Sequence, residues 1–177
     1  TGTGIPPTRI DSVIGIVKAY TTRVGNGPFP TELTDEEGEK LRQIGAEFGA
    51  TTGRPRRCGW FDAFLVSYSK MINGITSAAV TKLDVLSSYE KIKVCVGYEL
   101  NGKKLKTFPT NVEHLNNVKP IYEEVDGWME DISNCTDYDS LPEKTKDYLN
   151  FIAKHSGINI RIISVGPKRK QTFWVNK

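Results

Sequence analysis

The stretch Ala78-Ala79-Val80-Thr81-Lys82-Leu83-Asp84 passes directly from small and β-branched residues to a charged pair. An uninterrupted run of this kind favours a strand that is buried on both faces of a sheet. Residues 158–165 repeat the arrangement, with an isoleucine-rich run before a Gly-Pro turn. Open α/β sheets bind their ligands beyond the carboxyl ends of such strands. We therefore expect an α/β fold whose functional residues follow these two strands.

The remaining patterns predict a mixed sheet with flanking helices. Residues 12–20 fit either a buried strand or a short helix, because their periodicity does not decide between the two. We expect helices at residues 34–45, 61–73 and 142–155, the last one ended by Gly157. We expect strands at 91–100 and 103–108, joined by an Asn-Gly turn, and a last strand at 171–175.

The first expected helix has a recognisable start. Thr34 is the predicted N-cap, with Glu37 at the position of the capping-box carboxylate. Leu41 and Ile44 then fall on one face of the helix, which should pack against the core.

Composition limits the classes of function. A chain of 177 residues is long enough for one domain with a sizeable core, so residues 1–177 are predicted to form a single domain. The net charge of +3 is too small to indicate nucleic acid as the main partner. No apolar run approaches the roughly 20 residues that span a bilayer, which argues against a membrane partner. Three widely spaced cysteines lack metal-ligand spacing and predict free thiols in the cytoplasm: Cys58, Cys95 and Cys135.

The stretch Gly49-Ala50-Thr51-Thr52-Gly53-Arg54-Pro55-Arg56-Arg57-Cys58-Gly59-Trp60 places three arginines within four positions, behind two threonines. Planar guanidinium groups match carboxylate and phosphate oxygens two bonds at a time. The glycines let backbone N–H groups come close to a ligand. A solvated basic turn is the simpler alternative, but the stiff Pro55 and the bulky apolar residues after Arg57 argue against it. The stretch predicts a binding loop for a small anion.

The residues after the two strands predict nucleotide contacts. Thr81-Lys82-Leu83-Asp84 resembles the Asn-Lys-x-Asp guanine motif of GTP-binding proteins, with Thr in place of Asn. A fixed Asp84 carboxylate can accept from N1–H and the 2-amino group of guanine, and adenine offers neither donor. The stem of Lys82 can lie over the base. On residue type alone, an exposed ion pair between Lys82 and Asp84 remains open, as does an ordinary turn at 164–167.

The arginine stretch, extended to Asp62, resembles the aspartate-binding loop of the adenylosuccinate synthetase family. That family joins IMP and L-aspartate with GTP in AMP synthesis. Further stretches typical of the family follow in its order and at its spacing over nearly the whole chain: residues 9–11, 15–33, 81–86, 120–123, 127–128 and 164–169. The resemblance implies the fold of that family, which is related to P-loop GTP-binding folds. It also implies a cytoplasmic homodimer as the full-length enzyme.

The resemblance implies a set of binding residues. For L-aspartate they are Ala50, Thr51, Thr52, Gly53, Arg54, Pro55 and Arg56. For IMP they are Arg54, Val24 and Gly25, the last two packing on the ribose. For GTP they are Arg56, Lys82, Leu83, Asp84, Ser164, Val165 and Gly166. Fixed cations would lower the barriers for moving charge between anionic reactants. Arg57 is expected to be structural.

Several parts of the family's machinery are not found in the sequence. It contains no glycine-rich phosphate loop, and His114 and His155 match no catalytic position of the family. We therefore expect a C-terminal portion, with the catalytic base, the catalytic acid and the Mg²⁺ ligands in an absent N-terminal part. Alone, the chain should be inactive and hold no metal. The alternatives are a non-catalytic guanine-nucleotide module, or a basic surface for RNA or other anions carried by Arg54, Arg56, Arg57 and residues 168–170.

Overall fold

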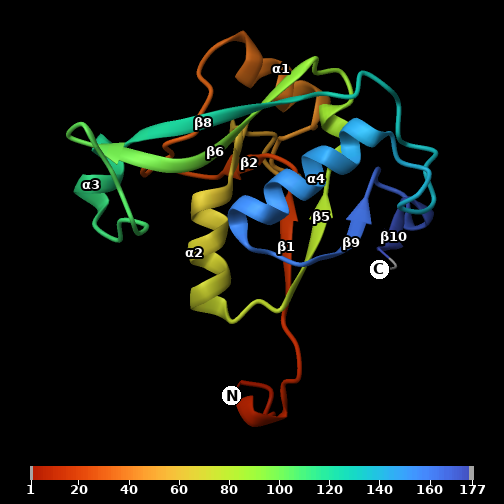
Figure 1. Cartoon of the computed structure of the whole chain (residues 1–177), viewed down its shortest axis with the longest axis horizontal. Helices are drawn as coiled ribbons and strands as arrows, with labels where there is room; N and C mark the ends of the chain where they lie inside the picture. Colours follow the sequence, from red (N-terminus) through yellow and green to blue (C-terminus); the bar gives the residue numbers. More distant parts are fainter. Residues whose placement is uncertain (1, 176–177) are drawn as a thin grey trace.

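The sheet that contains both predicted strand ends has four strands. The computed structural model describes residues 2–175; Thr1 and residues 176–177, which the single-domain prediction includes, lie outside the described residues. The strand order is β1 (Ile14–Lys18), β5 (Ser77–Thr81), β9 (Ile160–Ser164) and β10 (Thr172–Trp174) (Figure 1). β1, β5 and β9 run parallel, and β10 is antiparallel to β9. The carboxyl ends of β5 and β9 are therefore neighbours at one edge of the sheet.

These strands confirm the main sequence predictions. Within the ambiguous stretch at 12–20, residues 14–18 form a strand and not a helix, and each of them pairs with a residue of β5. The last strand is also present, within the predicted range. The mixed α/β fold is confirmed.

The second sheet surrounds the long strand β6. Its members are β4 (Phe61–Asp62), β6 (Lys91–Leu100), β7 (Lys103–Lys104) and β8 (Lys119–Asp126). β6 pairs antiparallel with β7 and β8 and parallel with β4. A separate two-stranded sheet joins β2 (Thr21–Arg23) to β3 (Arg57–Gly59). The Asn101-Gly102 turn is confirmed, with φ of 52° and 76° at its two residues.

The helices cover these sheets. They are α1 (Glu36–Ile44), α2 (Ala63–Asn73), α3 (Val112–Asn117) and α4 (Glu143–Ser156). Three short 3-10 turns lie at Pro7–Arg9, Leu83–Leu86 and Arg169–Gln171. In Figure 1, α4 crosses in front of the four-stranded sheet, and the Tyr148 hydroxyl donates to the carbonyl oxygen of Ala19 after β1 at 2.5 Å. Gly157 ends α4 in the left-handed conformation, as predicted.

Several local predictions are wrong. The N-cap of α1 is Asp35 and not Thr34, because the Asp35 carboxylate accepts from the Gly38 N–H group at 3.2 Å. Ile44 is 45% exposed, whereas Leu41 is fully buried; Ile44 lines a pocket instead of the core. α2 begins after Asp62, since Phe61 and Asp62 pair with β6 first.

The return strand predicted at 103–108 ends at Lys104, and β8 takes its place beside β6. Neither β8 nor α3 was predicted. β8 is polar and contains Pro120, so its own residues give little strand signal, and its pairing with β6 is long-range.

One core joins the two sheets and anchors the strand ends. The buried apolar cluster includes Val80 of β5, Ile163 of β9, Val94 of β6 and Ile152 of α4. Leu83, two residues after β5, and Val165, the first residue after β9, belong to the same cluster. Since interiors are close-packed, the backbone at both strand ends is held in place.

Candidate functional site

A pocket of about 540 Å³ opens at the ends of β5 and β9. Four of the predicted GTP residues line it: Lys82, Asp84, Ser164 and Gly166. The turn after α1, the end of β1 and the turn that follows Gly166 complete the wall. Two sequence stretches that are far apart in the chain thus meet because their strands are parallel neighbours.

Asp84 carries the most unusual polar atom of this pocket. Its Oδ1 is buried and has no hydrogen-bond partner among residues 2–175. Burial raises the pKa of the Asp84 carboxyl group above its ordinary value. Leaving a buried acceptor unpaired costs about 1–3 kcal/mol. A ligand that brings N–H donors to this carboxylate would remove that cost.

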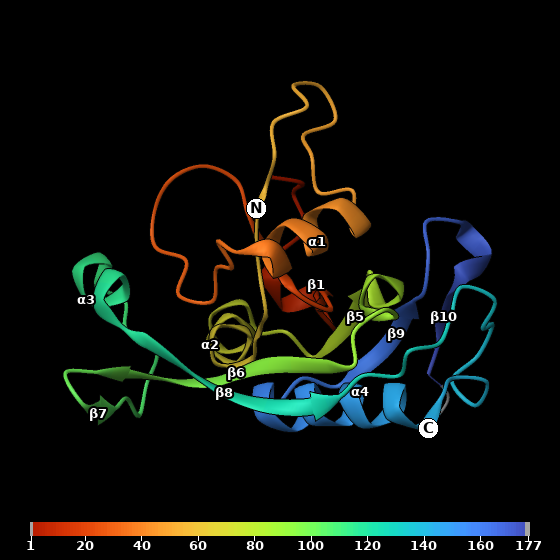
Figure 2. The ribbon, with the colours of Figure 1, turned by 90° about the horizontal axis from the view of Figure 1, so that it is seen from above.

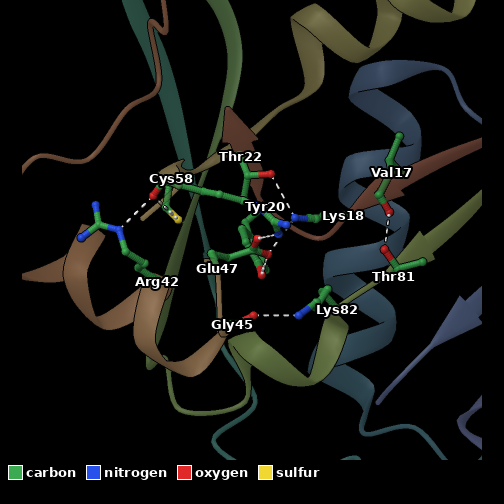
Figure 3. Close-up of polar contacts among 11 residues, drawn as sticks. Val17, Lys18, Tyr20, Thr22, Arg42, Gly45, Glu47, Cys58, Thr81 and Lys82 are labelled. Carbon is green, nitrogen blue, oxygen red and sulfur yellow. Dashed lines mark hydrogen bonds and ion pairs between the residues drawn. The ribbon is translucent and has the colours of Figure 1, made fainter. Parts of the chain in front are cut away.

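Lys82 does not form the ion pair that was the simpler explanation of Lys82 and Asp84. Its Nζ donates to the carbonyl oxygen of Gly45 at 2.7 Å (Figure 3). No salt bridge between Lys82 and Asp84 occurs in the described part of the chain. Lys82 is also left-handed, with φ of 61°. It therefore ties the turn after α1 to the end of β5 and leaves the carboxylate free.

The other predicted GTP residues divide into two kinds. Leu83 and Val165 are fully buried, so only their backbone groups could reach a ligand. Ser164 Oγ donates to the Gly166 carbonyl and accepts from Thr172 Oγ1, both at 3.1 Å. A Cβ at Gly166 would lie 2.4 Å from the Gln171 side chain. Contacts within residues 164–172 therefore hold this side of the pocket in place.

The predicted aspartate loop projects from the rest of the fold. Residues 50–55 are exposed, and Figure 2 shows this part of the chain extending away from α1. Two backbone bonds close it: Gly49 N–H to the Arg54 carbonyl at 2.9 Å, and Gly53 N–H to the Gly49 carbonyl at 2.8 Å. The Arg54 guanidinium has no hydrogen-bond or salt-bridge partner among the described residues.

The Arg56 side chain, unlike that of Arg54, has a partner among the described residues. Its Nη1 lies 2.7 Å from Oε2 of Glu47, a side chain with no exposed surface. Glu47 Oε1 also accepts from Lys18 Nζ at 2.7 Å and from the Tyr20 hydroxyl at 2.5 Å (Figure 3). Burial by itself would raise the pKa of Glu47, but the hydrogen bonds from Lys18, Tyr20 and Arg56 outweigh it and lower that pKa. Glu47 is therefore an ionised centre for two cations.

Arg57 has the structural role that was expected. Its Nε donates to Glu32 at 2.7 Å, and its Nη1 donates to the carbonyl oxygens of Gly25 and Gly27 at 3.1 and 2.9 Å. These bonds connect the base of the arginine loop to the segment that contains Val24 and Gly25, the predicted IMP residues. Both of those residues are exposed, Val24 by 78%.

The chain matches the model of a known protein family. The family model described as adenylosuccinate synthetase matches residues 1–173. The chain belongs to the adenylosuccinate synthetase family. Adenylosuccinate synthetases of Trichlorobacter lovleyi and Geobacter sulfurreducens are 57% and 54% identical to it, over 175 and 176 residues. In both cases the match covers 99% of this chain and 41% of the relative.

A solved structure agrees with this adenylosuccinate synthetase assignment. It is described as fully ligated adenylosuccinate synthetase from Plasmodium falciparum, and it superposes with a TM-score of 0.94 at 44% identity. The match covers 99% of this chain and 42% of that one. The chain therefore spans about two fifths of the length of the synthetases that it matches.

The family implies Mg²⁺, but the described residues do not offer a site for it. Within residues 2–175 no three His, Cys, Asp or Glu side chains are grouped so that they could hold a metal ion. Within the same residues, no helix is both long and apolar enough to span a bilayer.

Four residues around the base of the loop were not predicted to have a role: Lys18, Tyr20, Arg42 and Glu47. Lys18 and Tyr20 lie inside a stretch typical of the family, which was the only available signal. Glu47 lies two residues before the arginine stretch, and nothing in its neighbours indicates that it is buried. Its side-chain contacts come from two other parts of the chain, residues 18–20 and Arg56.

Proposed function

We propose that this chain corresponds to the C-terminal part of an adenylosuccinate synthetase and supplies its guanine site and its aspartate loop. The whole enzyme would join IMP and L-aspartate with the use of GTP. The observation that carries the proposal is the unpartnered Asp84 Oδ1 in the pocket between the ends of β5 and β9.

Guanine fits the chemistry of this pocket. N1–H and the 2-amino group are two parallel donors, and a carboxylate accepts both. Adenine presents no such pair of donors, so its binding would leave the buried acceptor unpaired. Ser164 and the backbone groups of Leu83, Val165 and Gly166 lie at the same edge and would contact the rest of the nucleoside.

The arginine loop would hold the L-aspartate carboxylates. Arg54 is exposed and unpaired among the described residues, so its planar fork is available for a carboxylate. In this proposal Arg54 also reaches IMP near the ribose, on which Val24 and Gly25 pack. Arg56 would face the GTP phosphates. Transfer of the GTP phosphoryl group to the 6-oxygen of IMP, and its displacement by the aspartate amine, both move negative charge that these cations stabilise.

The remaining chemistry would come from outside this chain. We place the catalytic base, the catalytic acid and the Mg²⁺ ligands in the N-terminal part of the enzyme, so the chain alone would be inactive. We also propose a homodimer in the cytoplasm. The cytoplasmic location is supported by three free cysteines, which suit a reducing compartment.

The basic-surface alternative is less well supported. Of its six cations, Arg56 and Arg57 are paired with Glu47 and Glu32, and Lys168 and Arg169 line the same pocket as Asp84. A surface for polynucleotides needs several free cations, and its affinity should fall steeply with salt.

The test is Asp84→Asn in the full-length enzyme. The amide puts a donor where an acceptor is needed, so kcat/KM for GTP should fall by about 100-fold or more. Xanthosine triphosphate has a 2-oxo group that can accept from the new amide, so it should restore part of the activity. Steady-state turnover with each nucleotide measures both effects.

Asp126→Asn is the matched control, because Asp126 is an exposed carboxylate in an ion pair with Lys91. It should leave nucleotide preference unchanged. An unchanged preference for GTP in Asp84→Asn would remove the guanine-site assignment.

A further inference from the structure

We propose that Glu47 is a positioning residue: it fixes the Arg56 guanidinium and the Lys18 ammonium as one preset cationic site for the phosphate groups of GTP. The proposal rests on the proposed function, because it takes Arg56 to face those phosphates. Glu47 has no exposed surface and receives three hydrogen bonds, from Lys18, Tyr20 and Arg56.

Arg56 is held at three points. Its Nη1 contacts Glu47 Oε2 at 2.7 Å, and its backbone N–H donates to the Glu47 carbonyl at 2.9 Å. Its own carbonyl accepts from Arg42 Nε at 2.8 Å. The side chain is nevertheless 32% exposed, so its outer N–H groups remain available. Glu47 thus fixes both the backbone and the guanidinium of the same arginine.

Lys18 connects Glu47 and Arg56 to the pocket at the ends of β5 and β9, the proposed guanine pocket. It ends β1, stands opposite Thr81 in the register with β5, and lines the pocket. Its Nζ donates to Glu47 and to Thr22 Oγ1 at 3.0 Å (Figure 3). One carboxylate therefore links the base of the arginine loop to the wall of the pocket.

The group formed by Glu47, Lys18 and Arg56 carries a net positive charge toward solvent. One buried carboxylate faces two cations that are each about 30% exposed, so the group as a whole is cationic toward solvent. A well-packed apolar side chain in place of a buried ion pair is often equally stable or more stable. What only a carboxylate provides at this position is a fixed place for both cations, which is the preorganisation that phosphoryl transfer requires.

Arg57 and Glu32 offer the internal comparison. They form the same kind of pair one residue further along, but Arg57 binds the 25–27 segment, whereas Glu47 binds Lys18, which lines the pocket. If both glutamates only stabilised the fold, neutralising Glu47 and neutralising Glu32 should have the same effect on the kinetics.

The experiment compares Glu47→Gln with Glu32→Gln in the full-length enzyme, with kcat and KM determined separately for GTP, IMP and aspartate. Misplacement of a positioning group by about 1 Å can cost on the order of 100-fold. We expect kcat/KM for GTP to fall by roughly 10–100-fold in Glu47→Gln, and to stay within about twofold in Glu32→Gln.

The direction of the change separates positioning from charge alone. If Glu47 only weakened the positive field, its neutralisation would lower KM for GTP. A lower or unchanged KM for GTP with unchanged kcat overturns the proposal.

Arg56→Gln supplies a second measurement. If Glu47 acts through Arg56, the effect of Glu47→Gln should shrink in the Arg56→Gln background. An equal effect in both backgrounds would show that Glu47 does not position Arg56. Should Glu47→Gln fail to fold, Glu47→Asp keeps the charge but withdraws it by one methylene, and the same fall in kcat/KM for GTP is expected. A wild-type enzyme without any IMP-, aspartate- and GTP-dependent turnover would instead refute the proposed function itself.

Discussion

The proposed guanine pocket and the arginine loop differ in how they are attached to the core. The pocket lies at the ends of two core strands, with Leu83 and Val165 buried directly behind it. The loop at 50–55 is exposed and is closed by its own backbone bonds. Under the proposed function, base selection would depend on a preset buried acceptor, whereas aspartate binding would depend on an exposed segment outside the core.

The same contrast occurs between neighbouring arginines. Arg54 is without a partner among the described residues, whereas Arg56 is fixed by Glu47 and Arg42. The free and the fixed guanidinium groups thus lie only two residues apart in the chain. The free fork suits a small substrate that arrives and leaves, and the held one suits charge stabilisation during the reaction.

The largest effect in the loop is expected for Arg54→Leu. A charge-assisted hydrogen bond to a carboxylate contributes about 1.5–3 kcal/mol, or roughly 10–150-fold. We expect the KM for aspartate to rise and kcat to fall in the full-length enzyme, with no loss of thermal stability. Arg54→Lys should also be impaired, because a point charge cannot replace the planar fork.

Arg9→Leu is the control for Arg54→Leu, since Arg9 is an exposed cation outside the loop. Its kinetics should match those of the parent enzyme. If the Arg54→Leu enzyme melted at a lower temperature, Arg54 would not be the free group that the comparison requires.

A smaller effect concerns the rigidity of the base of the loop relative to its tip. A Cβ at Gly59 would lie 2.1 Å from the Thr31 carbonyl oxygen, a backbone atom that cannot swing away. Gly59→Ala should therefore lower the free energy of unfolding by about 1–3 kcal/mol, as overpacking does. Denaturant titration of the full-length enzyme measures it.

Gly53→Asn tests the tip in the same way. Gly53 has φ of 65° with open space around it, and Asn tolerates that conformation. The change should cost less than about 0.5 kcal/mol, as surface substitutions do. Equal losses for Gly53→Asn and Gly59→Ala would contradict the distinction between a rigid base and an adaptable tip.

The smallest expected effect is a pH dependence of the pocket. Burial raises the pKa of Asp84, so in the folded chain it takes up a proton at a higher pH than a free aspartate does. Stability that depends on this group therefore increases as pH falls through the raised pKa, because the folded state binds the proton more tightly. The proposed guanine recognition requires the ionised form, so kcat/KM for GTP should decrease over the same acidic range.

Asp84→Asn should remove that acidic limb from the pH profile measured with xanthosine triphosphate. The arginine loop has no titratable acid of its own, so the KM for aspartate should not share the limb. A limb of the same position and size in both substrates would assign the titration to another group.

The residues themselves predicted part of the lining of one pocket. The run into Lys82 and Asp84 predicted a strand end with a nucleotide contact, and the structure places both residues in one pocket with Ser164 and Gly166. The free cation of the loop was also among the predicted residues. The site contacts missed were those of Glu47, because its polar partners Lys18, Tyr20 and Arg56 are distant in sequence and its immediate neighbours do not indicate them.

The sequence by itself determined the family, the strand ends and the arginine loop, since residue types and short spacings encode local conformation and available chemistry. Only the tertiary structure decided that β5 and β9 are neighbours, that β8 lies beside β6, and that Lys18, Tyr20 and Arg56 meet at Glu47. Strand pairing and burial depend on contacts between residues far apart in the chain. Local propensity does not specify such contacts, which form only when the whole core packs.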